Sequence, residues 1–160
     1  MWFRQTAREF AGSKGNANRK AMQALVDAGQ QPGLLAYHGG ETVGWISVAP
    51  RTEYTRLKRS RILKPVDNRP VWSIVCLFVR KTARRQKISE ALISAAIDYV
   101  RTNGGTIVEG YPLEPKEANI PDAFACTGLA SSFRKSGFAE VARRSESRLI
   151  MRYHIGEQVL

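Results

Sequence analysis

Five basic side chains separate an apolar segment from an amphipathic one, a position from which they could bind phosphate. Residues 71–79 (VWSIVCLFV) are almost all apolar, residues 80–87 (RKTARRQK) hold the five basic side chains and no acid, and an amphipathic segment begins at Ile88. The first N–H groups of a helix lack partners and the helix dipole is positive there, so a helix beginning at Ile88 would stabilise an anion. The alternative is an ordinary strand and helix joined by a basic turn.

Glu109 and Tyr111 are the candidates for proton transfer. They stand two positions apart in the segment 106–111, so they would share one face of a strand. Glu109 could take a proton from an ammonium group, directly or through a water molecule. A Glu109 held in a salt bridge is an equally good interpretation, and Tyr111 fits the wall of a cleft better than the role of catalyst.

Metal and membrane functions find no support in the sequence. The two cysteines, Cys76 and Cys126, form no CxxC or Cys/His pattern, so no metal site is expected. Two buried thiols in a reducing cytoplasm are the simplest interpretation. The longest apolar run, residues 74–79, is too short to cross a bilayer, and the first ten residues lack the apolar core of a secretory signal. We therefore expect a cytoplasmic protein with no membrane partner.

Positive charge is concentrated in two segments. The net charge is +11, and residues 51–64 and 80–87 contribute +5 each. Such concentration indicates an anionic partner, which could be a polyphosphate cofactor, an acidic substrate or nucleic acid. For residues 51–64, a solvated basic face is an equally good interpretation.

The order of the expected elements predicts a mixed α/β sheet with helices on both faces. Hydrophobic periodicity and the positions of glycine and proline delimit the elements, and Gly39-Gly40 predicts a tight hairpin turn. A length of 160 residues fits one domain, residues 1–160. The expected strands are 1–4, 34–38, 42–49, 71–79, 106–111, 138–142 and 148–154, and the expected helices are 17–28, 55–61, 88–101 and 122–136.

The spacing in the basic turn resembles the acetyl-CoA motif of the GNAT family of N-acetyltransferases. The family pattern is Arg/Gln-x-x-Gly-x-Gly/Ala; Arg84 fits its first position, Ser89 is a small residue at its last, and Lys87 replaces its middle glycine. A second family feature, an aromatic residue followed by x-x-x-Gly-Phe, matches residues 133–138 (FRKSGF). The resemblance covers most of the chain and implies the GNAT acyltransferase fold, with a mostly antiparallel central sheet and helices on both faces.

The resemblance implies acetyl-CoA as co-substrate, with no metal. The pyrophosphate would lie at the turn, and the pantetheine arm would lie along the end of the preceding strand, where that strand separates from its neighbour. Glu109 and Tyr111 would then lie near the thioester. The residues implied to contact the cofactor are Leu77, Phe78, Val79, Arg84, Arg85, Gln86, Lys87, Ile88, Ser89 and Phe133.

Three positions depart from the family pattern. Lys87 stands where glycine is usual; with ordinary helical backbone angles its side chain could point outward and reach a phosphate. Phe133 stands where a tyrosine often protonates the leaving thiolate, so it is expected to pack against the cofactor arm or in the core. Cys126 stands where the family tends to have asparagine, and a small, partly buried helical residue is the favoured interpretation of it.

The implied function is acetyl transfer to the amine of a small molecule by direct attack. The alternative is a binding protein of the same fold that holds acyl-CoA without turnover. A nucleic-acid-binding role is less favoured, because the basic segments lack interleaved aromatic residues. If residues 51–64 flank the acceptor site, an acceptor that also carries a carboxylate or phosphate suits their charge. A homodimer is left open.

Overall fold

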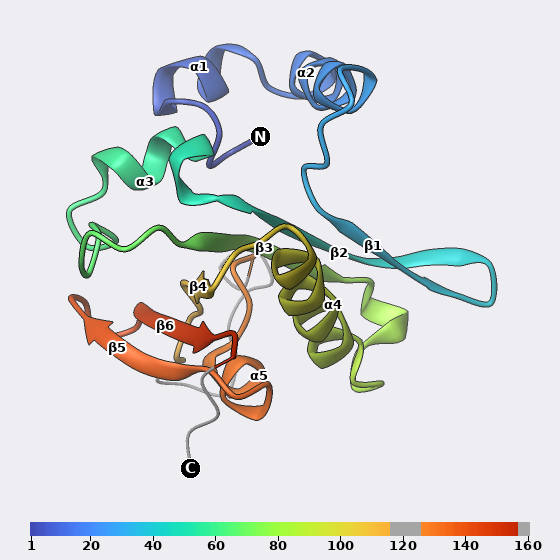
Figure 1. Ribbon diagram of the computed structural model, residues 1–160. Coiled ribbons are helices and arrows are strands. Elements are labelled where there is room, and N and C mark those ends of the chain that lie inside the picture. The colour runs from blue at the N-terminus through green and yellow to red at the C-terminus, as the bar shows by residue number, and fades with distance from the viewer. Residues whose placement is uncertain (116–125, 157–160) are drawn as a thin grey trace.

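One six-stranded sheet organises the chain, in the order β1-β2-β3-β4-β6-β5. The computed structural model describes residues 1–115 and 126–156 (Figure 1). β3 and β4 are parallel, and the other neighbouring pairs are antiparallel, as expected for a mostly antiparallel sheet. The strands are β1 (Leu34–His38), β2 (Glu41–Pro50), β3 (Trp72–Val79), β4 (Ile107–Gly110), β5 (Ala139–Arg143) and β6 (Leu149–His154).

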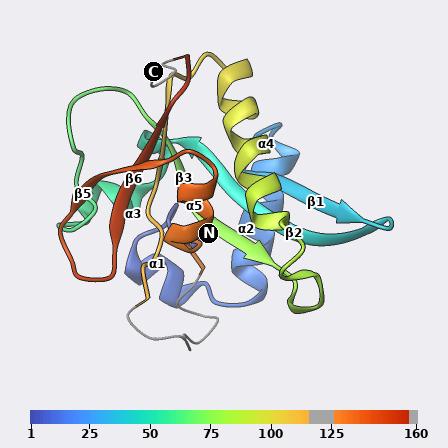
Figure 2. The ribbon, with the colours of Figure 1, turned by 90° about the horizontal axis from the view of Figure 1, so that it is seen from below.

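Helices cover both faces of the sheet, which confirms the predicted layering. Figure 1 shows α1, α2 and α3 on one side, and α4 and α5 on the other. Figure 2, viewed from below, shows α4 running along the sheet in front of β2 and β3. The helices are α1 (Ala7–Gly12), α2 (Asn16–Asp27), α3 (Thr55–Arg59), α4 (Ile88–Thr102) and α5 (Ala130–Lys135), and two 3-10 turns are η1 (Arg51–Glu53) and η2 (Lys81–Ala83).

The apolar character of β3 has a direct structural reason. Successive side chains of a strand point to opposite faces, and both faces of β3 are covered. Ile74 is fully buried in the core cluster that contains the inner side chains of α4, whereas Val75 belongs to a second cluster with Leu57 of α3. A register shift opposite Ser47 and Val48 leaves Val75 as an extra residue in β3, a bulge that bends the strand.

Local signals predicted the hairpin and the long helix well. β1 and β2 pair through Gly39 and Gly40, both with positive φ. α4 buries the apolar stripe that its 3.6-residue period predicts, and the chain leaves the helix through Gly104 at φ 76°. The buried residues of α4 are Leu92, Ile93, Ala96, Ile97 and Val100.

Two expected elements were wrong. Residues 1–4 form a turn rather than a strand, because the carbonyl of Met1 accepts hydrogen bonds from the N–H groups of Arg4 and Gln5. The helix expected over 122–136 begins only at Ala130; residues 122–125 lie outside the described residues, and residues 126–129 form an extended turn. Cys126 is therefore an exposed turn residue rather than a helical one.

Candidate functional site

β3 and β4 separate after only three paired residues. Their last pair joins Ile74 to Gly110, and beyond it the two backbones no longer bond to each other. Residues 126–129 lie between them: the N–H of Leu77 donates to the carbonyl of Cys126 (2.9 Å), and the N–H of Leu113 donates to the carbonyl of Gly128 (2.9 Å). The sheet therefore opens between β3 and β4 beyond this last pair, and residues 126–129 bridge the opening.

Phe133 fills the inner side of this opening. Its side chain is fully buried and stacks edge-on against Phe138, with ring centroids 5.0 Å apart. A Cβ atom on Gly110 would lie 2.2 Å from the Phe133 ring, and one on Gly128 would lie 2.9 Å from it. Glycine is thus required at Gly110 because the phenyl ring occupies the space of a side chain. The structure places Phe133 in the core, where its burial excludes it from solvent.

The basic turn adopts an unusual backbone. Arg85 and Lys87 have φ angles of 64° and 59°, and they are the two non-glycine residues with positive φ among those described. Lys87, the N-cap of α4, therefore does not have the ordinary helical angles considered from the sequence, although its side chain is exposed. It instead takes the left-handed conformation that glycine adopts most easily.

This turn suits a phosphate group. Left-handed residues alternating with extended or right-handed ones direct successive N–H groups into a common concavity that binds anions. α4 has fifteen residues, and its N-terminal dipole adds positive potential at the turn. The side chains of Arg84, Arg85, Gln86 and Lys87 are exposed, and those of Ile88 and Ser89 are half-buried. The residues of the turn therefore fit a pyrophosphate in both backbone shape and charge.

The strand residues assigned to the cofactor arm differ in exposure and in hydrogen bonding. Leu77 is buried, and its N–H is bonded to Cys126. Phe78 is exposed to 55% of its surface, and Val79 is half-buried, with its carbonyl accepting a hydrogen bond from Nε of Arg84 (3.4 Å). The end of β3 thus presents an accessible apolar surface directly before the basic turn.

Glu109 and Tyr111 lie on one side of β4 and its continuation, as their spacing predicted, and both are fully buried. The Tyr111 hydroxyl donates to Oε1 of Glu109 at 2.7 Å and contacts the Ser73 hydroxyl at 2.8 Å. Two guanidinium groups bind the same carboxylate: Nη1 of Arg51 lies 3.1 Å from Oε1, and Nε of Arg152 lies 2.7 Å from Oε2. The pair is therefore part of a buried ionic network.

This network extends to the connection between β2 and β3. Arg152 also binds both carboxylate oxygens of Asp67 (2.6 and 3.2 Å), and Arg51 donates to the carbonyls of Leu57 and Leu63. The hydrogen bonds from Arg152 hold the pKa of Asp67 well below its usual range. Burial, reinforced by the nearby Glu109 carboxylate, raises the pKa of Tyr111, so its hydroxyl stays protonated.

Sequence reasoning missed Arg51, Asp67 and Arg152. One signal was present: Arg152 follows three apolar residues in the strand LIMRYH, and a charge at such a position needs a buried partner. The partners themselves are 43 and 85 residues away in the chain and could not be assigned from spacing.

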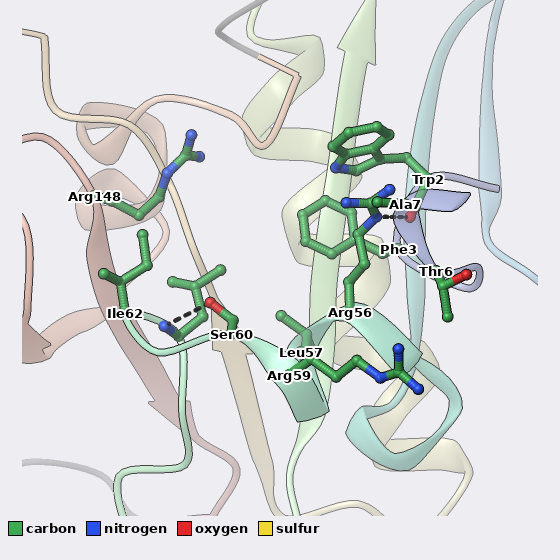
Figure 3. Close-up of a pocket in the computed structure, with 11 residues that line it drawn as sticks. Trp2, Phe3, Thr6, Ala7, Arg56, Leu57, Arg59, Ser60, Ile62 and Arg148 are labelled. Atoms are coloured by element: carbon green, nitrogen blue, oxygen red, sulfur yellow. Dashed lines mark hydrogen bonds between the residues drawn. The ribbon is translucent and has the colours of Figure 1, made fainter. Parts of the chain in front are cut away.

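A pocket of about 450 Å³ opens between α1, α3 and residues 60–63. Leu57 and Leu63 line it and belong to the core cluster on the sheet face opposite α4. Figure 3 shows Trp2, Phe3 and Arg56 on one side of this pocket, and Ile62 and Arg148 on the other. A volume of this size accommodates a small metabolite.

Within 1–115 and 126–156, no three metal-ligating side chains (His, Cys, Asp or Glu) gather closely enough to hold a metal ion. None of the helices in the same part of the chain has both the length and the apolar character needed to cross a membrane.

The sequence model of the acetyltransferase (GNAT) family matches residues 2–117. The chain belongs to the GNAT family. Among curated proteins, none matches this sequence. The family assignment therefore rests on the sequence model, with the structure as an independent comparison of the fold.

Solved GNAT structures share this fold at low sequence identity. A GNAT acetyltransferase from Streptococcus pneumoniae is 12% identical over 89% of this chain and 78% of its own, with a TM-score of 0.57. PaiA N-acetyltransferase from Thermoplasma acidophilum, solved with coenzyme A, is 15% identical over 87% and 71% (TM-score 0.55). Ribosomal-protein-alanine N-acetyltransferase from Brucella melitensis is 16% identical over 86% and 76% (TM-score 0.53).

Proposed function

We propose that this GNAT protein transfers the acetyl group of acetyl-CoA to the amine of a small molecule. The observation that carries the proposal is the backbone of the basic turn, where Arg85 and Lys87 hold positive φ angles directly before a fifteen-residue helix. A left-handed residue other than glycine costs free energy, and such conformations persist where the direction of the N–H groups matters. Coenzyme A in the related PaiA structure supports the choice of anion.

The proposed contacts divide between two parts of the cofactor. The pyrophosphate would be held by the N–H groups and side chains of residues 84–89, and the pantetheine arm would lie along Phe78 and Val79. Acetyl-CoA supplies an activated thioester, and the amine of the acceptor attacks its carbonyl directly. The protein contributes orientation and removal of a proton. No metal takes part in this proposal.

The roles of Glu109 and Tyr111 stay predictions. Both are fully buried, and the Glu109 carboxylate is bound by two guanidinium groups. We propose that the pair positions Arg51, which holds the carbonyls of Leu57 and Leu63 beside the pocket between α1 and α3. Proton removal from the acceptor would then fall to a water molecule or to a group outside this network.

Titration calorimetry with acetyl-CoA tests the proposed binding site. Lys87→Met and Arg85→Met should each raise the Kd, whereas Lys81→Met, which removes the same charge from the neighbouring 3-10 turn, should change it little. Equal effects of all three variants would show nonspecific charge attraction. Thiol release with a panel of amines then measures turnover, and its absence for every amine would contradict transferase activity.

A second candidate function is acyl-CoA binding without turnover. The bond between the Leu77 N–H and the Cys126 carbonyl favours it, because this N–H would otherwise be available to the cofactor or to the thioester oxygen. Tight acetyl-CoA binding without thiol release would identify this alternative. A nucleic-acid-binding role is not supported by any contact described above.

We further infer that residues 1–160 act as one domain in the cytoplasm. Both cysteines are free thiols, which suits a reducing compartment. An acceptor that carries an anionic group suits the arginines around the pocket between α1 and α3. Size-exclusion chromatography with light scattering will establish whether the protein is a homodimer.

A further inference from the structure

The pocket between α1 and α3 contains three arginine side chains, Arg56, Arg59 and Arg148, set among apolar ones. Arg59 is close enough to Glu9 for its charge to lower the pKa of that carboxyl, behind the larger effect of hydrogen bonds from Thr6. No described carboxylate forms an ion pair with Arg56 or Arg148. A pocket with this lining is complementary to a ligand that is apolar at one end and anionic at the other.

Arg148, at the pocket wall, has N–H groups that no described residue binds. Its Nη1 atom donates to the carbonyl of Tyr111 (3.1 Å) and to the Thr127 hydroxyl, which uses both N–H groups of that nitrogen. Its Nε and Nη2 atoms have no partner among the described residues, and the N–H groups on that edge of a guanidinium match the two oxygens of a carboxylate. Burial lowers the pKa of Arg148, a cost that a bound anion would offset.

Arg56 supports the same conclusion from the opposite wall. Its guanidinium lies over the Trp2 ring, 3.4 Å from the ring centroid, and its Nε donates to the Trp2 carbonyl at 2.6 Å. Its Nη2 atom is buried without a hydrogen-bond partner. A buried donor without a partner is uncommon in proteins and marks a place where a ligand or water can bind.

Arg148 also connects the pocket to the opening between β3 and β4. Tyr111 directly follows β4, and Thr127 directly follows Cys126, whose carbonyl bonds to Leu77 in the opening. If Arg148 holds a carboxylate, an amine on the adjacent carbon would therefore lie near the opening between β3 and β4. Trp2, Phe3 and Ile62 would surround the rest of the molecule.

We propose that the pocket between α1 and α3 binds an amino-carboxylate with an apolar or aromatic side chain, whose carboxylate pairs with Arg148. The position of the amine as acetyl acceptor rests on the proposed function, whereas carboxylate binding does not. Carboxylate is favoured over phosphate because Nε and Nη2 of Arg148 offer one two-pronged edge, which matches the two oxygens of a carboxylate.

Binding of 3-phenylpropanoate, measured by calorimetry without acetyl-CoA, tests the pocket alone. Arg148→Gln should raise its Kd about tenfold or more, because one partner of a charge-assisted pair is lost. The Kd of 3-phenylpropan-1-ol, which lacks the charge, should stay within about twofold. Arg61→Gln, which removes a charge from the β2–β3 connection next to the pocket but outside its lining, is the matched control. Equal binding of 3-phenylpropanoate by the wild type and Arg148→Gln, or no binding by the wild type, overturns the proposal.

A second variant keeps the test decisive if Arg148→Gln fails to fold. Ile62 is 42% exposed and lies beside Arg148 in Figure 3, so Ile62→Glu should fold and offer Arg148 a competing carboxylate. It should abolish binding of 3-phenylpropanoate, whereas Ile62→Gln should preserve it. Unchanged binding by Ile62→Glu overturns the proposal.

Turnover separates this proposal from the proposed function. Phenylalanine should release thiol from acetyl-CoA faster than phenylalaninamide, and Arg148→Gln should remove this preference. If amines that lack a carboxylate release thiol and phenylalanine is not preferred over phenylalaninamide, the result supports the transferase. It overturns the proposal that the acceptor is an amino-carboxylate. Arg148-dependent binding of 3-phenylpropanoate without any thiol release supports the pocket and contradicts the transferase.

Discussion

At the scale of single residues, the basic turn bears a conformational cost. Arg85 and Lys87 both hold left-handed backbone angles, which cost about 1–2 kcal/mol for a residue with a Cβ atom. Glycine in the same conformation avoids this steric cost and loses more freedom on folding. The chain therefore retains a glycine-like backbone while placing lysine charge beside the proposed phosphate.

Lys87→Gly should raise the free energy of unfolding by about 1 kcal/mol. The substitution removes the steric cost of the left-handed backbone, and the entropic cost of ordering glycine offsets only part of that gain. Urea denaturation measures this change. Lys81→Gly, at a position without positive φ, should lower stability instead. A loss of stability in Lys87→Gly would contradict the left-handed backbone. Its acetyl-CoA affinity, compared with that of Lys87→Met, separates the backbone contribution from that of the charge.

Glu109 is the charge on which the buried network depends. Glu109→Gln keeps the shape but leaves Arg51 and Arg152 without their shared carboxylate. Removing one partner of a buried ion pair destabilises by about 3–5 kcal/mol. Glu41→Gln, which breaks an exposed pair with Arg80, should cost less than about 1 kcal/mol. Chemical denaturation compares the two, and an unaltered stability with lost activity would instead support Glu109 as the base.

The sequence predicted part of this network and no more. Period-two spacing placed Glu109 and Tyr111 together, and the structure joins them by a 2.7 Å hydrogen bond. Their cationic partners come from η1, directly after β2, and from β6, and a sequence pattern carries no information on which distant element lies alongside. Whether either residue takes part in catalysis stays a prediction.

At the scale of elements, the separation of β3 from β4 depends on α5. Phe133 of α5 packs over Gly110 at the last residue of β4, where a Cβ atom would approach the ring to 2.2 Å. The opening is thus maintained by a ring on one element and a missing side chain on another. Residues 126–129 complete the arrangement through backbone bonds to both sides.

Gly110→Ala should destabilise the protein by about 2 kcal/mol or more, because the added Cβ would lie 2.2 Å from the fully buried ring of Phe133 and force it to shift. Gly12→Ala is the matched control, since nothing lies within 4 Å of its added Cβ and its φ is negative. Thermal unfolding followed by circular dichroism measures both. A Gly110→Ala protein as stable as Gly12→Ala would show that Phe133 does not occupy this space.

Elements with strong local signals were predicted, and those defined by distant contacts were not. The Gly39-Gly40 turn and the apolar stripe of α4 are encoded in neighbouring residues. Residues 1–4 are apolar enough for a strand, yet the carbonyl of Phe3 pairs with the N–H of Arg56, and Trp2 packs on Phe10. Tertiary partners therefore decided this segment against its local propensity.

At the scale of the whole molecule, net charge is a poor guide to the surface. Of the basic residues in 51–64, Arg51 is directed into the buried network and Arg56 lies over Trp2. In the basic turn, Arg80 pairs with Glu41. Other residues of the chain therefore hold these three arginines, and the net charge of +11 does not show which basic side chains are available to a partner.

The same pairing determines how stability responds to acid. Hydrogen bonds from Arg152 lower the pKa of Asp67 below the 3.8 of the unfolded chain. As pH falls below about 4, the unfolded state binds this proton first, so the contribution of Asp67 is present above that pH and is lost progressively below it. Glu114 and Glu140 act in the same direction, because hydrogen bonds from Arg134 and Arg143 lower their pKa values.

Asp67→Asn should therefore lower stability at neutral pH and flatten its fall in acid. The free energy of unfolding, measured in urea between about pH 6 and pH 2.5, should approach that of the wild type towards the acid end, because Asp67 of the unfolded wild type binds its proton there while the folded state has yet to do so. Asp98→Asn, which removes the exposed partner of Arg101, should follow the wild-type curve throughout. Parallel curves for Asp67→Asn and the wild type would mean that Arg152 does not hold Asp67 in solution. The ion pair between β6 and the β2–β3 connection would then contribute less to stability than the structure indicates.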